Sequence, residues 1–165
     1  MWFKYLLITI AFFILALVQA SFFTYFSILG AVPSFIFILF LLILFFYRKD
    51  RIFSIFTAIV AGFFLDVFSI SIFASNIVSF LIISFASEKL FSNLKEIDEK
   101  FSIFHFILFF ISFFIFNELF IYLVNYFLGN LSFNNLSWIF LVEIVYNLVF
   151  AIIAFYAFKK LQSKK

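Results

Sequence analysis

The chain has 165 residues, of which 68% are hydrophobic, far above the roughly 45–50% of soluble domains. Phenylalanine alone supplies 35 residues, against 3 glycines and 1 proline. A soluble core of this size could not bury so much aromatic surface and still present a polar exterior. The composition therefore excludes a water-soluble protein and predicts a chain whose solvent is lipid.

Cysteine content and charge exclude further classes of protein. The absence of cysteine excludes disulfide scaffolds, thiol nucleophiles, thiolate zinc sites and iron–sulfur clusters. The formal charge of +3 comes from 11 Lys and Arg against 8 Asp and Glu. Because the basic residues fall in short clusters between apolar runs, they are typical of membrane topology signals, and no nucleic-acid partner is predicted.

The apolar runs predict the fold class. A transmembrane helix needs about 20 apolar residues, because it crosses about 30 Å of hydrocarbon at about 1.5 Å per residue. Six runs qualify, two of them short, and backbone satisfaction in lipid makes each one a helix. The prediction is a single all-α domain, a polytopic membrane protein with a bundle of six transmembrane helices. The predicted spans cover residues 5–26, 33–47, 52–69, 72–87, 102–128 and 138–158.

The first span has two interpretations. Lys4, the apolar run after it and residues 18–20, Val-Gln-Ala, resemble a secretory signal with a small-residue cleavage site. The run continues through Phe22 and Phe26, which favours an uncleaved anchor. The second span begins at Pro33, whose missing amide hydrogen costs nothing at a helix start.

One sizeable hydrophilic segment, residues 88–100, separates the fourth and fifth spans. Its Leu90, Leu94 and Ile97 recur at helical spacing. This pattern predicts an amphipathic connector on the inner membrane surface. Docking of a cytoplasmic partner to the same segment is the alternative.

The basic residues predict the orientation of the six spans. The connections that would lie outside contain no charged residue, and they cover residues 27–32, 69–71 and 129–137. Six spans therefore place every Lys and Arg on the cytoplasmic side, as the positive-inside rule requires, whereas five or seven would not. We expect a multi-pass membrane protein with both termini in the cytoplasm.

Polar residues inside the spans are the candidate functional residues, because charges in a span are costly. Three acids, Asp66, Glu118 and Glu143, all fall in the predicted outer half. Uncharged polar residues share this bias, and no Lys or Arg lies at that depth. The candidate partner or ligand contacts are Gly62, Asp66, Asn76, Glu118, Tyr122, Glu143 and Asn147.

Helical spacing groups several of the candidates. Residues four apart share a helix face, so Glu118 neighbours Tyr122, and Glu143 neighbours Asn147. Without a basic partner, the acids are expected to be protonated, hydrogen-bonded to Asn and Tyr groups, or wetted from outside.

A second face in the third span combines Ala58, Gly62 and Asp66. Two small residues and an acid on one face allow another helix to approach closely, so this face is predicted to be buried in protein. The outer polar residues as a whole either fasten the helices together or form a functional site. Both interpretations predict a polar cavity or knot at the outer end.

The sequence offers no set of catalytic residues. His105 is predicted to be an interfacial side chain near the inner surface, because no second His or acid stands at ligand spacing. A Ser and His arrangement would require both at one depth, and His105 lies on the side opposite to the acids. Asp66 is the only Asp in a span, which argues against aspartyl chemistry. We predict a non-enzymatic protein with no cofactor and no metal site.

Three segments together carry a resemblance. They are residues 30–33, Gly-Ala-Val-Pro, the Phe-rich second span ending at Tyr47, and residues 62–66, Gly-Phe-Phe-Leu-Asp. With the size, the span count and the cytoplasmic termini, they resemble the rod shape-determining protein MreD family. The likeness covers mainly residues 30–90. Ser34 stands where that family commonly has Asp, and residues 72–76 replace its Gly-rich loop.

The resemblance implies a non-enzymatic scaffold subunit of the bacterial cell-shape (elongation) machinery, located in the bacterial cytoplasmic (inner) membrane. Its implied partners are the membrane-anchored MreC scaffold, the actin-like MreB filament and the peptidoglycan synthases. The alternative is the substrate-binding subunit of an energy-coupling-factor vitamin transporter, which has similar size and span count and a small-residue contact like Ala16-x-x-x-Ala20. Short outer loops with few hydrogen-bonding groups, apart from residues 130–135, favour the scaffold. The oligomeric state stays open.

Overall fold

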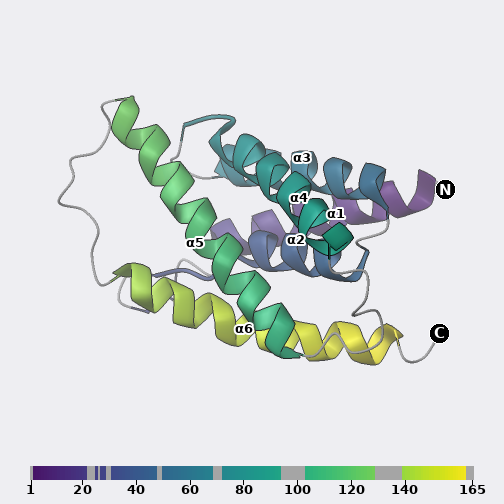
Figure 1. Cartoon of the computed structure of the whole chain (residues 1–165). Coiled ribbons are helices and arrows are strands. Elements are labelled where there is room, and N and C mark those ends of the chain that lie inside the picture. Colours follow the sequence, from purple (N-terminus) through teal and green to yellow (C-terminus); the bar gives the residue numbers. More distant parts are fainter. Residues whose placement is uncertain are drawn as a thin grey trace.

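The residues that the structure describes form six helices. The computed structural model describes residues 2–21, 25, 27–28, 31–47, 50–68, 72–93, 103–128 and 139–162. The helices are α1 (Trp2–Ser21), α2 (Phe35–Phe46), α3 (Arg51–Phe68), α4 (Ser75–Asn93), α5 (Ile103–Phe127) and α6 (Ile139–Gln162). Both chain ends lie at one end of the bundle, and α5 crosses the other helices obliquely (Figure 1). The predicted all-helical class and the order of six helices are confirmed.

The central helix is α2, the most apolar segment of the chain. Nine of its 12 residues are buried. A helix that is apolar on every side must be surrounded by other apolar groups. The Phe37 ring lies 5.4 Å from the Phe80 ring of α4 and 6.1 Å from the Phe110 ring of α5. Phe40 stacks on Phe80 at 4.4 Å. Aromatic rings around α2 thus bind the bundle together, which accounts for much of the phenylalanine content.

Of the six predicted membrane spans, four correspond to helices that are long and apolar enough to cross a membrane, and these are α1, α3, α5 and α6. The 12 residues of α2 rise about 18 Å, well short of about 30 Å of hydrocarbon. The 19-residue α4 is long enough but less apolar, because it carries Glu88, Lys89 and several buried polar side chains. These four apolar helices are compatible with a membrane protein in contact with lipid.

The predicted boundaries lie within two residues of the observed ones for α2, α3 and α5, and differ more for α1, α4 and α6. Helix α1 begins three residues before the predicted start of its span, and residues 22–24 and 26 lie outside the described part of the chain. Helix α4 begins at Ser75 rather than residue 72, because the chain turns at residues 72–74, where Ala74 has a φ of 74°. It then continues to Asn93, so the first part of the predicted connector is helical. The rest of that connector lies outside the described residues.

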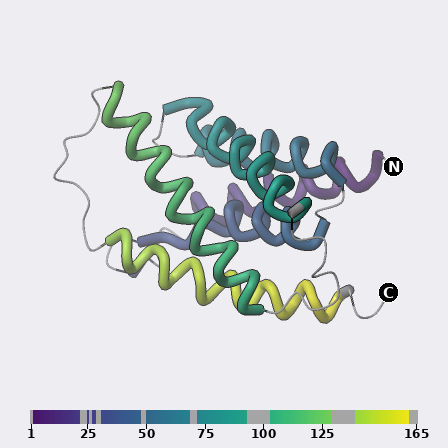
Figure 2. The backbone as a smooth tube through the Cα atoms, in the orientation of Figure 1, coloured from purple at the N-terminus to yellow at the C-terminus, as the bar shows by residue number. Residues whose placement is uncertain are grey.

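Helix α1 packs along one edge of the bundle, on α2 and α3. Only Ile8, Phe12 and Ala16 of this helix are buried. Large apolar side chains such as Phe13 and Leu17 are exposed on its other side. Exposed apolar surface of this extent is typical of a face covered by lipid. The tube in Figure 2 shows how the chain then runs back and forth along the bundle, with α5 oblique to the helices before and after it.

Candidate functional site

Polar side chains from several helices gather near one end of the bundle. We call this group the acidic cluster, and it comprises Asp66, Asn76, Asn117, Glu118, Glu143 and Asn147. Lys4, near the start of α1, pairs with Asp50, which directly precedes α3. Asp66, near the end of α3, therefore lies toward the end of the bundle opposite the chain termini. We call the end with the termini the basic end.

Asp66 joins the end of α3 to the start of α4. It is 4% exposed, and its Oδ1 accepts hydrogen bonds from the Asn76 backbone N–H at 3.0 Å and the Asn76 side-chain amide at 2.9 Å. Its Oδ2 accepts from the Ile77 backbone N–H at 3.2 Å. The first amides of a helix have no acceptor within that helix and attract negative charge. Asp66 thus caps α4 from a neighbouring helix.

Gly62 allows the two helices to meet this closely. A Cβ atom at position 62 would lie 2.5 Å from the Ile77 Cα and 2.7 Å from the Ile77 backbone nitrogen. On the same side of α3, Ala58 and Ala61 are fully buried. The predicted small-residue face is therefore confirmed as a buried helix contact. Its partner is α4 of the same chain, so Gly62, Asp66 and Asn76 form an internal junction.

The hydrogen bonds continue from α4 to α5. The Ser79 hydroxyl, one turn after Asn76, donates to Asn117 Oδ1 at 2.7 Å. The Asn117 side-chain amide donates to Glu118 Oε1 at 3.4 Å. The hydroxyl oxygen of Tyr122, one turn further along α5, is buried. Asn117 is one of the uncharged polar residues that the sequence places in the outer half, but it was not among the candidate contacts. Ser79 was not singled out, because a single serine gives a weak signal in an apolar helix.

Helix α6 contributes the last members of the cluster. Asn147 Oδ1 accepts from the Ser34 backbone N–H, directly before α2, at 2.6 Å. The Asn147 side-chain amide donates to the backbone carbonyl of Glu143 at 2.9 Å, so the predicted neighbourhood of these two residues is confirmed. Glu143 and Glu118 interact electrostatically between α6 and α5. Polar groups near this end come from Ser34, directly before α2, and from helices α3 to α6. Their hydrogen bonds link α3 to α4, α4 to α5, and the start of α2 to α6.

The described basic side chains form their ion pairs at the other end of the bundle. Lys4 pairs with Asp50, and the Arg51 Nε lies 3.2 Å from Glu88 Oε2. Within the described residues, no Lys or Arg forms an ion pair with Asp66, Glu118 or Glu143. Backbone amides and Ser and Asn side chains are the groups that contact Asp66 and Glu118 there.

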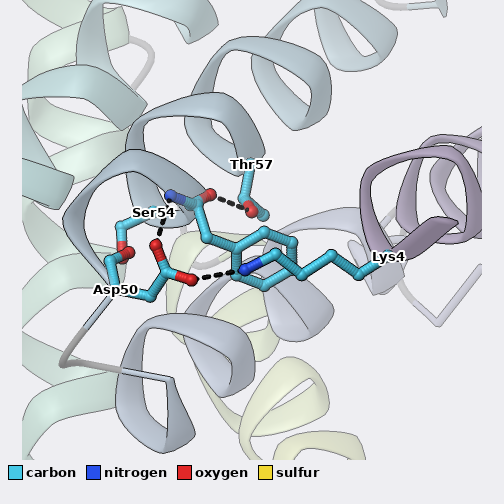
Figure 3. A network of polar contacts seen from close by, with 5 residues as sticks. Lys4, Asp50, Ser54 and Thr57 are labelled. Atoms are coloured by element: carbon cyan, nitrogen blue, oxygen red, sulfur yellow. Dashed lines mark hydrogen bonds and ion pairs between the residues drawn. The ribbon is translucent and has the colours of Figure 1, made fainter. Parts of the chain in front are cut away.

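Asp50 links α1 to the start of α3. Its carboxylate accepts from Lys4 and, at 3.1 Å, from the Phe53 backbone N–H, while the Lys4 ammonium lies 4.7 Å from the centre of the Phe53 ring (Figure 3). Asp50 thus acts as the N-cap of α3. The hydrogen bond from Lys4 lowers the pKa of the Asp50 carboxyl. An Asp directly before an apolar helix is a capping signal that the sequence analysis had not used.

Removing Lys4 is expected to change how stability depends on pH. A carboxyl whose pKa is lower in the folded state stabilises the fold above its unfolded pKa of about 4, and this contribution is lost as the pH falls below that value. Lys4→Met should therefore reduce stability more near about pH 7 than near about pH 3. Both losses should be small, because solvent screens the Lys4–Asp50 pair. The measurement is the detergent unfolding midpoint at both pH values. Lys159→Met, at an exposed lysine of α6, is the control. An unchanged pH profile in Lys4→Met would contradict the assignment.

His105 lies at the start of α5, half-buried, with its ring 6.3 Å from that of Phe104. This position is far from Asp66 along the bundle, as the sequence predicts. Among the described residues, no group of three His, Asp or Glu side chains could hold a metal ion.

Comparison with family models, curated proteins and solved structures finds no match for this chain. The class that the fold defines is an all-helical bundle with four helices able to cross a membrane. A more specific function rests on the sequence motifs and on the geometry of the acidic cluster.

Proposed function

We propose that the protein is a non-enzymatic scaffold subunit of the bacterial cytoplasmic membrane, acting in the cell-shape machinery with an MreC-like protein and supporting peptidoglycan synthesis. One observation carries the proposal. Gly62 and Asp66, which belong to one of the three segments that resemble the MreD family, form a buried joint between α3 and α4. A residue pair used for rigid packing suits a scaffold better than a catalyst.

We further propose that all six helices cross the membrane and that both termini are cytoplasmic. Helix α2 is short, but the surrounding helices cover it, so it does not need to match the lipid thickness by itself. The partner surface would then lie on exposed apolar faces such as that of α1, since the acidic cluster is engaged within the chain.

Reporter fusions test this topology. Fusions after Ser71 or Leu128 are expected to be active only outside the cytoplasm, and fusions after Lys95 or Lys165 only inside, because the basic residues should stay in the cytoplasm. The measurement uses one reporter active outside and a second active inside. A reporter at Lys95 that is active outside would show that the orientation is wrong, whatever the family.

Depletion of the protein tests the scaffold role. In a rod-shaped host we expect rounded or widened cells, because wall elongation would lose a membrane subunit. Cell width is measured by microscopy, with re-expression of the wild-type chain as the control. Normal cell shape together with a vitamin auxotrophy would overturn the proposal and favour the energy-coupling-factor transporter subunit.

A further inference from the structure

A half-open apolar groove lies at the basic end, between the end of α4 and the start of α5. Its volume is about 210 Å³. Its lining includes Phe45, Leu90, Phe91, His105, Leu108 and Phe113. Leu90 and Leu108 are 49% and 60% exposed, so the groove opens on the surface that would face lipid.

The dimensions of the groove suit an acyl chain. Along α5 the lining extends from His105 to Phe113, which corresponds to about 12 Å of helix rise. One leaflet of hydrocarbon is about 15 Å deep, half of the whole core. The groove therefore begins at the level of the helix start and runs through most of one leaflet. A void of this shape beside lipid would be filled by a chain from the same leaflet.

The charges around the groove select the headgroup. The exposed Lys89 stands directly before Leu90, which lines the groove, and His105 lines the groove near the start of α5. Among the residues that the structure describes, no acidic side chain is part of this lining. The positive charge of Lys89 at the end of an apolar groove between membrane helices favours an anionic phospholipid headgroup, with about 1 kcal/mol per Lys near the surface.

We propose that this groove is a binding site for one anionic phospholipid, with an acyl chain between α4 and α5 and the headgroup beside Lys89 and His105. The proposed orientation of the chain places this lipid in the cytoplasmic leaflet. The site itself does not depend on the scaffold role, so lipid retention by the purified protein tests it separately.

The experiment measures lipids retained by the protein. The purified chain is exchanged into vesicles of equal parts phosphatidylglycerol and phosphatidylcholine, re-extracted in mild detergent, and analysed by native mass spectrometry. We expect one retained lipid, with phosphatidylglycerol preferred. Lys89→Gln should reduce that preference about fivefold, the fold-change equivalent to about 1 kcal/mol. Lys159→Gln, at the same end on α6, should not.

Leu108→Trp, which fills the groove, should abolish retention of either lipid. Leu119→Trp is the matched control, because Leu119 is 46% exposed on the same helix and does not line the groove. Ser112→Phe, at an exposed position of the lining, provides a second blocking variant should Leu108→Trp not fold. Wild-type retention in a folded blocking variant would overturn the site, and an unchanged lipid preference in Lys89→Gln would overturn the headgroup assignment.

Discussion

Gly62→Ala is expected to destabilise the bundle, and Gly62→Leu to prevent α3 and α4 from packing. The added Cβ would lie 2.5 Å from the Ile77 Cα, and a backbone atom cannot move aside as a flexible side chain can. Overpacking of this kind typically costs about 1–3 kcal/mol. The higher helix propensity of alanine offsets up to about 1 kcal/mol of this cost. The larger leucine side chain should exceed what the junction can absorb.

The measurement is the free energy of unfolding, obtained by titrating the purified protein from mild detergent into sodium dodecyl sulfate and following helix content. Ala157→Leu, at an exposed position of α6, controls for added bulk and should leave this free energy unchanged. Wild-type stability in both Gly62→Ala and Gly62→Leu would mean that the two helices do not meet at this distance. If Gly62→Leu lowered the free energy of unfolding no more than Gly62→Ala does, the packing explanation would also be wrong.

The sequence could predict those parts of the fold that depend on residues close together in the chain. Hydrophobic runs and helical spacing are local, so they predicted the six helices and the buried face of Gly62 and Asp66. The partner of that face depends on how the chain turns between α3 and α4, and no local pattern specifies the contact with Ile77. The burial of α2 inside the bundle was likewise not visible from its length and composition, because a lipid-facing span and a central helix are both apolar.

Polar residues show the same limit. The three acids stood out because charge is rare in apolar helices, and the structure places Glu118 and Glu143 near enough to interact. Ser79 and Asp50 were both missed because each residue type is common in its position. A serine is common in such helices, and an aspartate beside basic residues is ordinary for a membrane-flanking segment. Only the folded chain shows that Ser79 binds Asn117 and that Asp50 caps α3.

Asp66→Leu is expected to cost about 2–3 kcal/mol of stability, and Asp66→Asn distinctly less. Leucine would leave the buried N–H groups of Asn76 and Ile77 without their acceptor, and each unsatisfied buried donor typically costs about 1–3 kcal/mol. Asparagine keeps one oxygen that can accept from these amides, although its own amide group would face other donors. A polar contact between membrane helices is usually worth only about 0.6–2 kcal/mol, so both variants should still insert.

The same unfolding titration measures this series, with Asn76→Ala as the matched variant. Asn76→Ala removes the side-chain amide bound to Asp66 but keeps the backbone N–H, so it should cost less than Asp66→Leu. Equal losses for Asp66→Asn and Asp66→Leu would mean that the ionisable group itself is needed, and a role linked to protonation or to a bound ligand would then explain the acidic cluster better. Wild-type stability in Asp66→Leu would contradict the assignment of Asp66 as the cap of α4, because it would show that α4 begins at Ser75 without a hydrogen-bond acceptor from α3.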